Sequence, residues 1–320
     1  MVAWTGLLKL STLLSVLGLL AAAVGGCDRA EPADVAATVT SEPAGAPRLR
    51  VATVVIRFDN GRPDFGSSAP TDDRLRTVAV FADVDPADRA VVDALAGQPP
   101  VMDSAIAVDT CARQAHAVPP AAALPMVRPV SWIQLLDVGN LELRAGNLML
   151  PLQIHLLPSV IDATRGVRYD AAVEHGRSFL AAGALIVNST GGDGVAPFSA
   201  RVKVPRPVRI TFVGEQPTSA GVVQGLASDS ELRVRWGSVD GTADLELVAG
   251  AEQEEQAAWL RCRLRDDGDF SVPAALVAEL PARSPKRPWT VMLVRRTRGA
   301  VAGFSDHALV LELADSVHVD

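Results

Sequence analysis

The chain has 320 residues, and 30 Lys and Arg against 37 Asp and Glu give it a formal net charge of −7 at pH 7. An acidic balance of this kind disfavours binding to nucleic acid or to an anionic membrane surface. Aromatic residues make up only 4% of the chain, with a single tyrosine, so the core is expected to consist mainly of Val, Leu and Ala, and a sugar-binding platform of aromatic rings is not expected.

The N-terminal segment has the layout of an export signal. Lys9 adds a positive charge beside the amino terminus, residues 10–24 are almost wholly apolar, and a polar sequence follows Cys27. A membrane span needs about 20 predominantly apolar residues. The shorter run therefore predicts a signal-peptide core, with a retained single-span anchor as the alternative.

The end of this segment predicts lipid attachment. Val24, Gly25, Gly26 and Cys27 resemble the lipobox of bacterial lipoproteins, in which small residues precede a cysteine that receives a diacylglyceryl group. The resemblance implies cleavage between Gly26 and Cys27, and a mature chain bound to a membrane through acyl chains such as palmitate on Cys27. Each buried methylene contributes about 0.8 kcal/mol, so two or three chains anchor a protein stably.

The expected location is the envelope of a Gram-negative bacterium, either at the outer membrane or at the periplasmic face of the inner membrane. Lys occurs only at positions 9, 203 and 286, and all other basic residues are Arg, a usage typical of high-GC genomes. Residues 27–49 contain the lipidated cysteine and then a proline-containing stretch without apolar periodicity, which predicts a disordered tether. The expected partners are the membrane, through the lipid, and an unidentified envelope protein.

From Arg50 onward, short runs rich in branched residues alternate with Gly, Pro, Asn and Asp, which indicates strands and turns. One helix is expected at residues 85–97, where Asp85 precedes a proline and Gly97 ends the segment. The overall prediction is an all-β fold made of antiparallel β-sandwich-like domains.

Two such domains are expected, at residues 50–205 and 206–320. Pro205 and Pro207 mark the boundary, because proline cannot donate a ladder hydrogen bond in a central strand.

The second domain shows the clearest strand pattern. Leu260, Cys262 and Leu264 alternate with arginines, which predicts a half-buried strand, and residues 266–269 ("DDGD") suit a tight hairpin turn. Roughly seven strands in about 115 residues favour an immunoglobulin-like sandwich. Residues 232–313 resemble the immunoglobulin-like modules of uncharacterised envelope lipoproteins from high-GC Gram-negative bacteria, although the second cysteine of the usual inter-sheet pair is missing. The resemblance implies a fold and transfers no catalytic residue.

Two cysteines remain beside Cys27. Export would place Cys111 and Cys262 in an oxidising compartment, where a disulfide could close a loop of about 150 residues. The alternative is that Cys262 is a small core residue. No Cys or His spacing supports a zinc site.

The motifs that suggest chemistry are weak. Ser305, Asp306 and His307 in "GFSDH" fall short of a nucleophile elbow, and adjacent residues cannot form a triad, so a hairpin loop is expected. Residues 83–88 hold three aspartates without the spacing of a calcium-binding EF-hand, and helix capping explains them better. The arginines of residues 294–299 are expected on a solvated strand face.

We therefore expect no catalytic residue, metal or cofactor, and a function as a binding or structural module in the envelope. The alternatives are an exported hydrolase that uses Ser305 or a histidine–acid pair, and a calcium-dependent adhesion module.

Overall fold

The computed structural model describes residues 48–60, 73–97, 106–116, 133–157, 164–192, 194–218, 222–224, 230–237, 239–241, 243–251, 257–280 and 288–319. All of them belong to one compact unit, Gly45–Asp320. The expected signal peptide, the lipobox with Cys27 and the tether up to residue 47 lie outside the described residues. Within those residues, no helix is long and apolar enough to cross a membrane.

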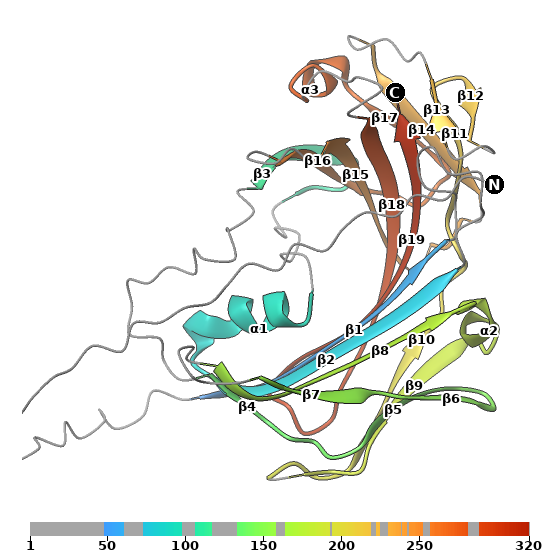
Figure 1. Cartoon of the computed structure of the whole chain (residues 1–320). Coiled ribbons are helices and arrows are strands. Elements are labelled where there is room, and N and C mark those ends of the chain that lie inside the picture. Colours follow the sequence, from blue (N-terminus) through green and yellow to red (C-terminus); the bar gives the residue numbers. More distant parts are fainter. Residues whose placement is uncertain are drawn as a thin grey trace, which may run out of the picture. The chain divides into compact units, whose positions relative to one another are not determined.

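The fold is all-β, as predicted, and its largest sheet has 11 strands in the order β3-β16-β15-β18-β19-β1-β2-β4-β8-β7, with β13 paired to β19 beside this path. These strands are β1 (Leu49–Asp59), β2 (Arg74–Val84), β3 (Thr110–His116), β4 (Ile133–Leu135), β7 (Gln153–Leu157), β8 (Thr164–Glu174), β13 (Val222–Val223), β15 (Asp244–Ala251), β16 (Ala257–Leu264), β18 (Trp289–Gly299) and β19 (Asp306–Val319). Figure 1 shows β18 and β19 running from the region of β15 to that of β1.

Two four-stranded sheets complete the fold, in the orders β10-β9-β5-β6 and β12-β11-β14-β17. The first contains β5 (Leu141–Ala145), β6 (Leu148–Pro151), β9 (Ala184–Ser189) and β10 (Phe198–Lys203), and the second β11 (Arg209–Val213), β12 (Gln216–Pro217), β14 (Leu232–Gly237) and β17 (Asp269–Val272). The helical segments are short: η1 (Pro86–Asp88), α1 (Arg89–Leu95), α2 (Arg177–Leu180) and α3 (Ala274–Val277).

Each small sheet packs against a different part of the large sheet, which gives the fold its β-sandwich character. One core joins β1, β2 and β8 to the sheet of β5 and β9, and around Phe81 its aromatic rings are close together, with the Phe81 and Phe304 centroids 5.4 Å apart. The other core joins β15, β16 and β18 to the sheet of β11 and β14. Both cores are rich in Val and Leu, as the composition predicts.

The large sheet takes strands from both sides of the boundary predicted at residues 205 and 206. β1 pairs in parallel with β19, with Val55 opposite Val310, whereas the sequence suggested antiparallel pairing throughout. Parallel pairing needs a long connection, and nearly the whole folded part of the chain separates these two strands. Leu311 of β19 lies in the first core and Val317 in the second. The two cores therefore share one sheet.

The predicted helix at residues 85–97 is present as η1 followed by α1. The Asp85 side chain accepts a hydrogen bond from the Ala87 amide at 2.9 Å, and Gly97 ends the segment with a φ of 68°. The acid thus caps the helix start, and glycine provides the left-handed conformation that its end requires.

Residues 266–269 do not form the expected hairpin. β16 pairs with β15 and β3, whereas β17 pairs with β14, so the turn carries the chain from the large sheet to a small one. The physical reason is the burial of Asp266, whose carboxylate accepts hydrogen bonds from the Trp236 indole at 2.8 Å and from Arg295 at 2.9 Å. Those bonds hold the start of the turn in the interior, whereas Asp267 and Asp269 remain exposed.

Candidate binding edge

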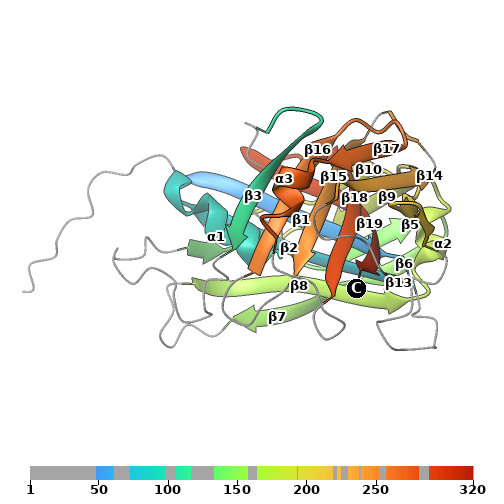
Figure 2. The ribbon, with the colours of Figure 1, turned by 90° about the horizontal axis from the view of Figure 1, so that it is seen from above.

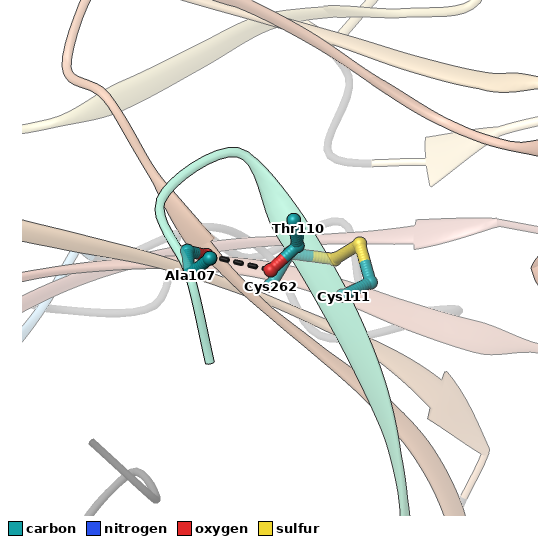
Figure 3. Close-up of a disulfide and its surroundings, with 4 residues drawn as sticks. All are labelled: Ala107, Thr110, Cys111 and Cys262. Atoms are coloured by element: carbon teal, nitrogen blue, oxygen red, sulfur yellow. Dashed lines mark hydrogen bonds between the residues drawn. A yellow bond between two sulfur atoms is a disulfide. The ribbon is translucent and has the colours of Figure 1, made fainter. Parts of the chain in front are cut away.

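Cys111 and Cys262 form a disulfide with an S–S distance of 2.07 Å (Figure 3). The two residues lie directly opposite each other on β3 and β16. Beside them, the Thr110 hydroxyl donates to the Ala107 carbonyl at 2.6 Å, and the Asp109 amide donates to the Arg263 carbonyl at 2.7 Å. The bridge therefore fixes a strand at the border of the large sheet to the second core.

The "GFSDH" residues have structural partners that exclude a local triad. Ser305 lies between β18 and β19, where its hydroxyl donates to the Arg50 carbonyl at 3.0 Å and accepts from the Arg50 amide at 3.1 Å. Asp306 forms an ion pair with Arg89 of α1 at 2.6 Å. Exposed His307 lies opposite Ala52 within the β1–β19 ladder. The segment covers the end of the loop between β18 and β19 and the first residues of β19, as the hairpin interpretation expects.

The aspartates of residues 83–88 have local structural roles as well. Asp83 forms an ion pair with Arg50 at 3.4 Å, and Asp85 caps the helix. No group of three or more His, Cys, Asp or Glu side chains within the described part of the chain could hold a metal ion.

Of the arginines predicted on a solvated strand face, Arg298 is exposed as expected, whereas Arg295 is buried and Arg296 is partly buried. The Arg295 side chain is 0% exposed and pairs with Asp266 at 2.8 Å. On the opposite face of β18, Arg296 bonds Glu312 at 2.7 Å and also bonds Glu246. Charged side chains can be buried where they are paired and hydrogen-bonded. The alternation of residues along one strand does not predict such pairing, because the partners lie on other strands.

Arg296 belongs to a charge ladder, which we define as Arg261, Glu246, Arg296, Glu312 and Arg57. These residues come from the consecutive strands β16, β15, β18, β19 and β1, and each carboxylate is shared by two guanidinium groups. Burial raises the pKa of the Glu312 carboxyl, but Arg296 and Arg57 outweigh it and hold that pKa below its ordinary value. The ladder thus cross-links neighbouring strands of the large sheet, and the lowered pKa makes Glu312 a poor candidate for a general base.

The most prominent surface feature is the open edge, which we define as Leu148, Met149, Ile154 and Leu156. These apolar side chains are 39%, 57%, 46% and 77% exposed, respectively. β6 ends one small sheet, β7 ends the large sheet, and the single residue Leu152 connects them. Figures 1 and 2 show β7 beside β8 at the border of its sheet. The edge thus passes directly from one layer of the sandwich to the other.

Two side chains of the open edge lie on the core face of their sheet and yet remain uncovered. Ile154 lies opposite Tyr169, which is 0% exposed, and Leu156 lies opposite the buried Val167. Residues directly opposite each other in a ladder share a face. The apolar core therefore extends to the end of the sheet, where no described strand covers it.

Charged groups around the open edge are balanced. His155 lies within β7, so it is a strand residue, as expected, and its Nε2 approaches the Asp170 carboxylate of β8. Arg144 and Glu142 of β5 form another pair at 2.6 Å, beside Met149. A surface that combines exposed apolar side chains, unpaired strand borders and little net charge is suited to strand addition by a protein.

Comparisons with known proteins provide no family for this chain. No protein-family model matches it, and no curated protein matches it. The yeast delta-COP-I mu-homology domain aligns with 86% of this chain and 98% of its own, at 10% sequence identity and a TM-score of 0.23. The same domain in complex with a Dsl1 WxWxV peptide aligns with equal coverage, identity and TM-score. Similarity at this level carries no argument about function.

Proposed function

We propose that this chain is a lipid-anchored protein of the Gram-negative cell envelope that acts as a binding module. The lipobox-like sequence that ends at Cys27, with the apolar run before it, supports the anchor. The many paired strands support a rigid module, and the immunoglobulin-like character of the part after residue 206 belongs to the same proposal.

The observation that carries the binding role is the open edge. A strand at the border of a sheet offers unpaired N–H and C=O groups, and natural proteins usually protect such borders with charges, prolines or a covering element. β7 has no Lys, Arg or Pro within Gln153–Leu157, and Leu156 is 77% exposed. An unprotected apolar border of this kind supports an interaction surface. Ser305 and Asp306 are engaged in structural contacts, which argues against a hydrolase that uses Ser305.

Fractionation tests the anchored part of this proposal. The full chain with a carboxy-terminal tag is expressed in a high-GC Gram-negative host beside a Cys27→Ser variant, and intact cells are treated with protease. We expect wild type in the membrane fraction and Cys27→Ser in the soluble periplasmic fraction, because only the lipid holds the protein on the bilayer. Loss of the tag on protease treatment would place the module on the cell surface, and protection would place it in the periplasm. Identical fractionation of the two proteins would contradict the anchor.

A further inference from the structure

We propose that the open edge binds a second copy of this chain, with β7 of one copy pairing antiparallel with β7 of the other across a two-fold axis. This inference rests on the proposed binding role of that edge. A two-fold contact uses the same surface on both copies, so the surface must be complementary to itself. The sequence and register of β7 meet that requirement.

Two prolines restrict the register. Pro151 precedes β7 and Pro158 follows Leu157 in the sequence, and proline cannot donate a ladder hydrogen bond. A slip by one residue would set the core face of one copy beside the outer face of the other. The symmetric register that pairs all 5 residues of β7 is therefore centred on His155.

This register matches apolar side chains with one another. Ile154 of one copy lies opposite Leu156 of the partner subunit, and the same contact is repeated on the other side of the axis. Both side chains lie on the core face, as their ladder partners Tyr169 and Val167 show. A two-fold axis perpendicular to the sheet keeps the core faces of both copies on the same side. Pairing would therefore extend the first core across the axis and cover the two exposed side chains.

The charges on the outer face of β7 and β8 do not oppose this contact. His155 lies opposite Arg168 of β8, and its Nε2 approaches the Asp170 carboxylate. The opposite charges of Arg168 and Asp170 balance within each copy. The register sets His155 of one copy opposite His155 of the partner subunit, and each imidazole has the Asp170 carboxylate of its own copy beside it. Like charges placed directly opposite across strands would be destabilising.

The proposed anchor would raise the chance of encounter. The residues between Cys27 and Arg48 would form the tether, and a flexible chain of about 20 residues has a root-mean-square length of about 25 Å. Tethers of this length would confine all copies of the protein to a thin layer beside the membrane, which raises their effective concentration. At that effective concentration, a dimer held by a pair of short strands can form.

Site-specific disulfide trapping tests the register. We would introduce His155→Cys into the full chain, purify it in detergent, add an oxidant and separate the products on a non-reducing gel. The two-fold register sets residue 155 of one copy opposite residue 155 of the other, so most of the protein should run at twice the monomer mass. Gln153→Cys is the matched control, because residue 153 has the same strand and face but lies opposite Leu157 of the partner subunit. It should remain monomeric, as should wild type.

A second change tests whether the contact depends on the apolar face. Adding Leu156→Arg to His155→Cys should reduce the cross-linked fraction at least tenfold, because the charge would be set against Ile154 of the partner subunit. Equal cross-linking of His155→Cys and Gln153→Cys would show random collision and overturn the proposal. So would a monomeric His155→Cys, or a monomer mass for wild type by light scattering at the highest soluble concentration.

The same variants separate this proposal from the anchor. His155→Cys is also made in a Cys27→Ser background, and both proteins are fractionated before oxidation. An unchanged fractionation pattern would contradict the lipid anchor, whereas the cross-linking pattern of the solubilised proteins alone decides the strand contact.

Discussion

Arg295 and Asp266 form an ion pair that is closed to solvent on both sides. The guanidinium Nη2 lies 2.8 Å from Oδ2 of the carboxylate, and the two side chains are 0% and 2% exposed. The same carboxylate accepts bonds from the Trp236 indole and the Asp240 amide. One acid thus accepts hydrogen bonds from three residues, two of them near the end of β14 and one on β18.

Asp266→Ala should therefore destabilise the protein strongly. Removing one partner of a buried pair leaves the other charge uncompensated, which costs about 3–5 kcal/mol. Urea unfolding followed by tryptophan fluorescence measures this loss. Asp269→Ala is the matched control in the same turn, since it removes only the exposed pair with Arg233 and should shift the midpoint far less. Equal shifts for the two variants would contradict the account of the turn.

The charge ladder predicts a loss of stability in acid. The folded-state pKa of Glu312 lies below its ordinary value, so between the two pKa values the unfolded chain binds more protons than the folded one. The contribution of Glu312 is thus complete above about pH 4.5 and is lost as the pH falls through the folded pKa. Glu312→Gln should lower stability at pH 7 and flatten its acid dependence. A series of thermal midpoints from pH 7 to pH 3 tests this, and parallel curves for the two proteins would be evidence against it.

The disulfide should stabilise the fold against unfolding. Cys111 and Cys262 are 151 residues apart, and in the chain-entropy model a loop of that size contributes about 5 kcal/mol. Reducing agent should lower the urea midpoint of wild type and leave that of a double Cys111→Ser, Cys262→Ser variant unchanged. A thiol assay on the unfolded wild-type protein should detect neither cysteine before reduction. Detection of both would show that the bridge is absent.

Tyr169 offers a clean spectroscopic test, because the chain contains a single tyrosine. Its hydroxyl donates to Asp137 at 2.7 Å and accepts from the Val138 amide at 2.9 Å. Burial, and then the Asp137 carboxylate, raise the pKa of this phenol above its ordinary value of 10.0. An ultraviolet titration of the folded protein should show no phenolate near pH 10, whereas the unfolded chain should ionise there. Ordinary titration of the folded protein would contradict the burial of this side chain.

Parts of this fold follow directly from the residues. The helix at residues 85–97 is marked by residues within the segment itself, Asp85 at its start and Gly97 at its end. The alternation of Leu260, Cys262 and Leu264 correctly indicates the face of β16 that packs into the core. Signals of this kind depend on near neighbours in the chain, and they are therefore readable without a structure.

Other features depend on partners far away in the chain. Arg296 is partly buried because Glu246 and Glu312 lie on adjacent strands, and its local pattern resembles that of a solvated face. The open edge also could not be predicted from the sequence, because its pattern suggests a covered strand. In "LMLPLQIHLL" apolar residues occupy both faces, which is the pattern of a strand covered on both sides, and only the sheet order shows that Leu156 has no described strand beyond it.

Metabolic labelling with tritiated palmitate tests the central claim most directly. The full chain and its Cys27→Ser variant would be expressed in the same Gram-negative host, immunoprecipitated through a carboxy-terminal tag and compared for incorporated label per molecule. We predict a labelled wild-type band and an unlabelled Cys27→Ser band. Equal labelling of the two proteins, or an unlabelled wild-type band, would contradict a lipid-anchored binding module.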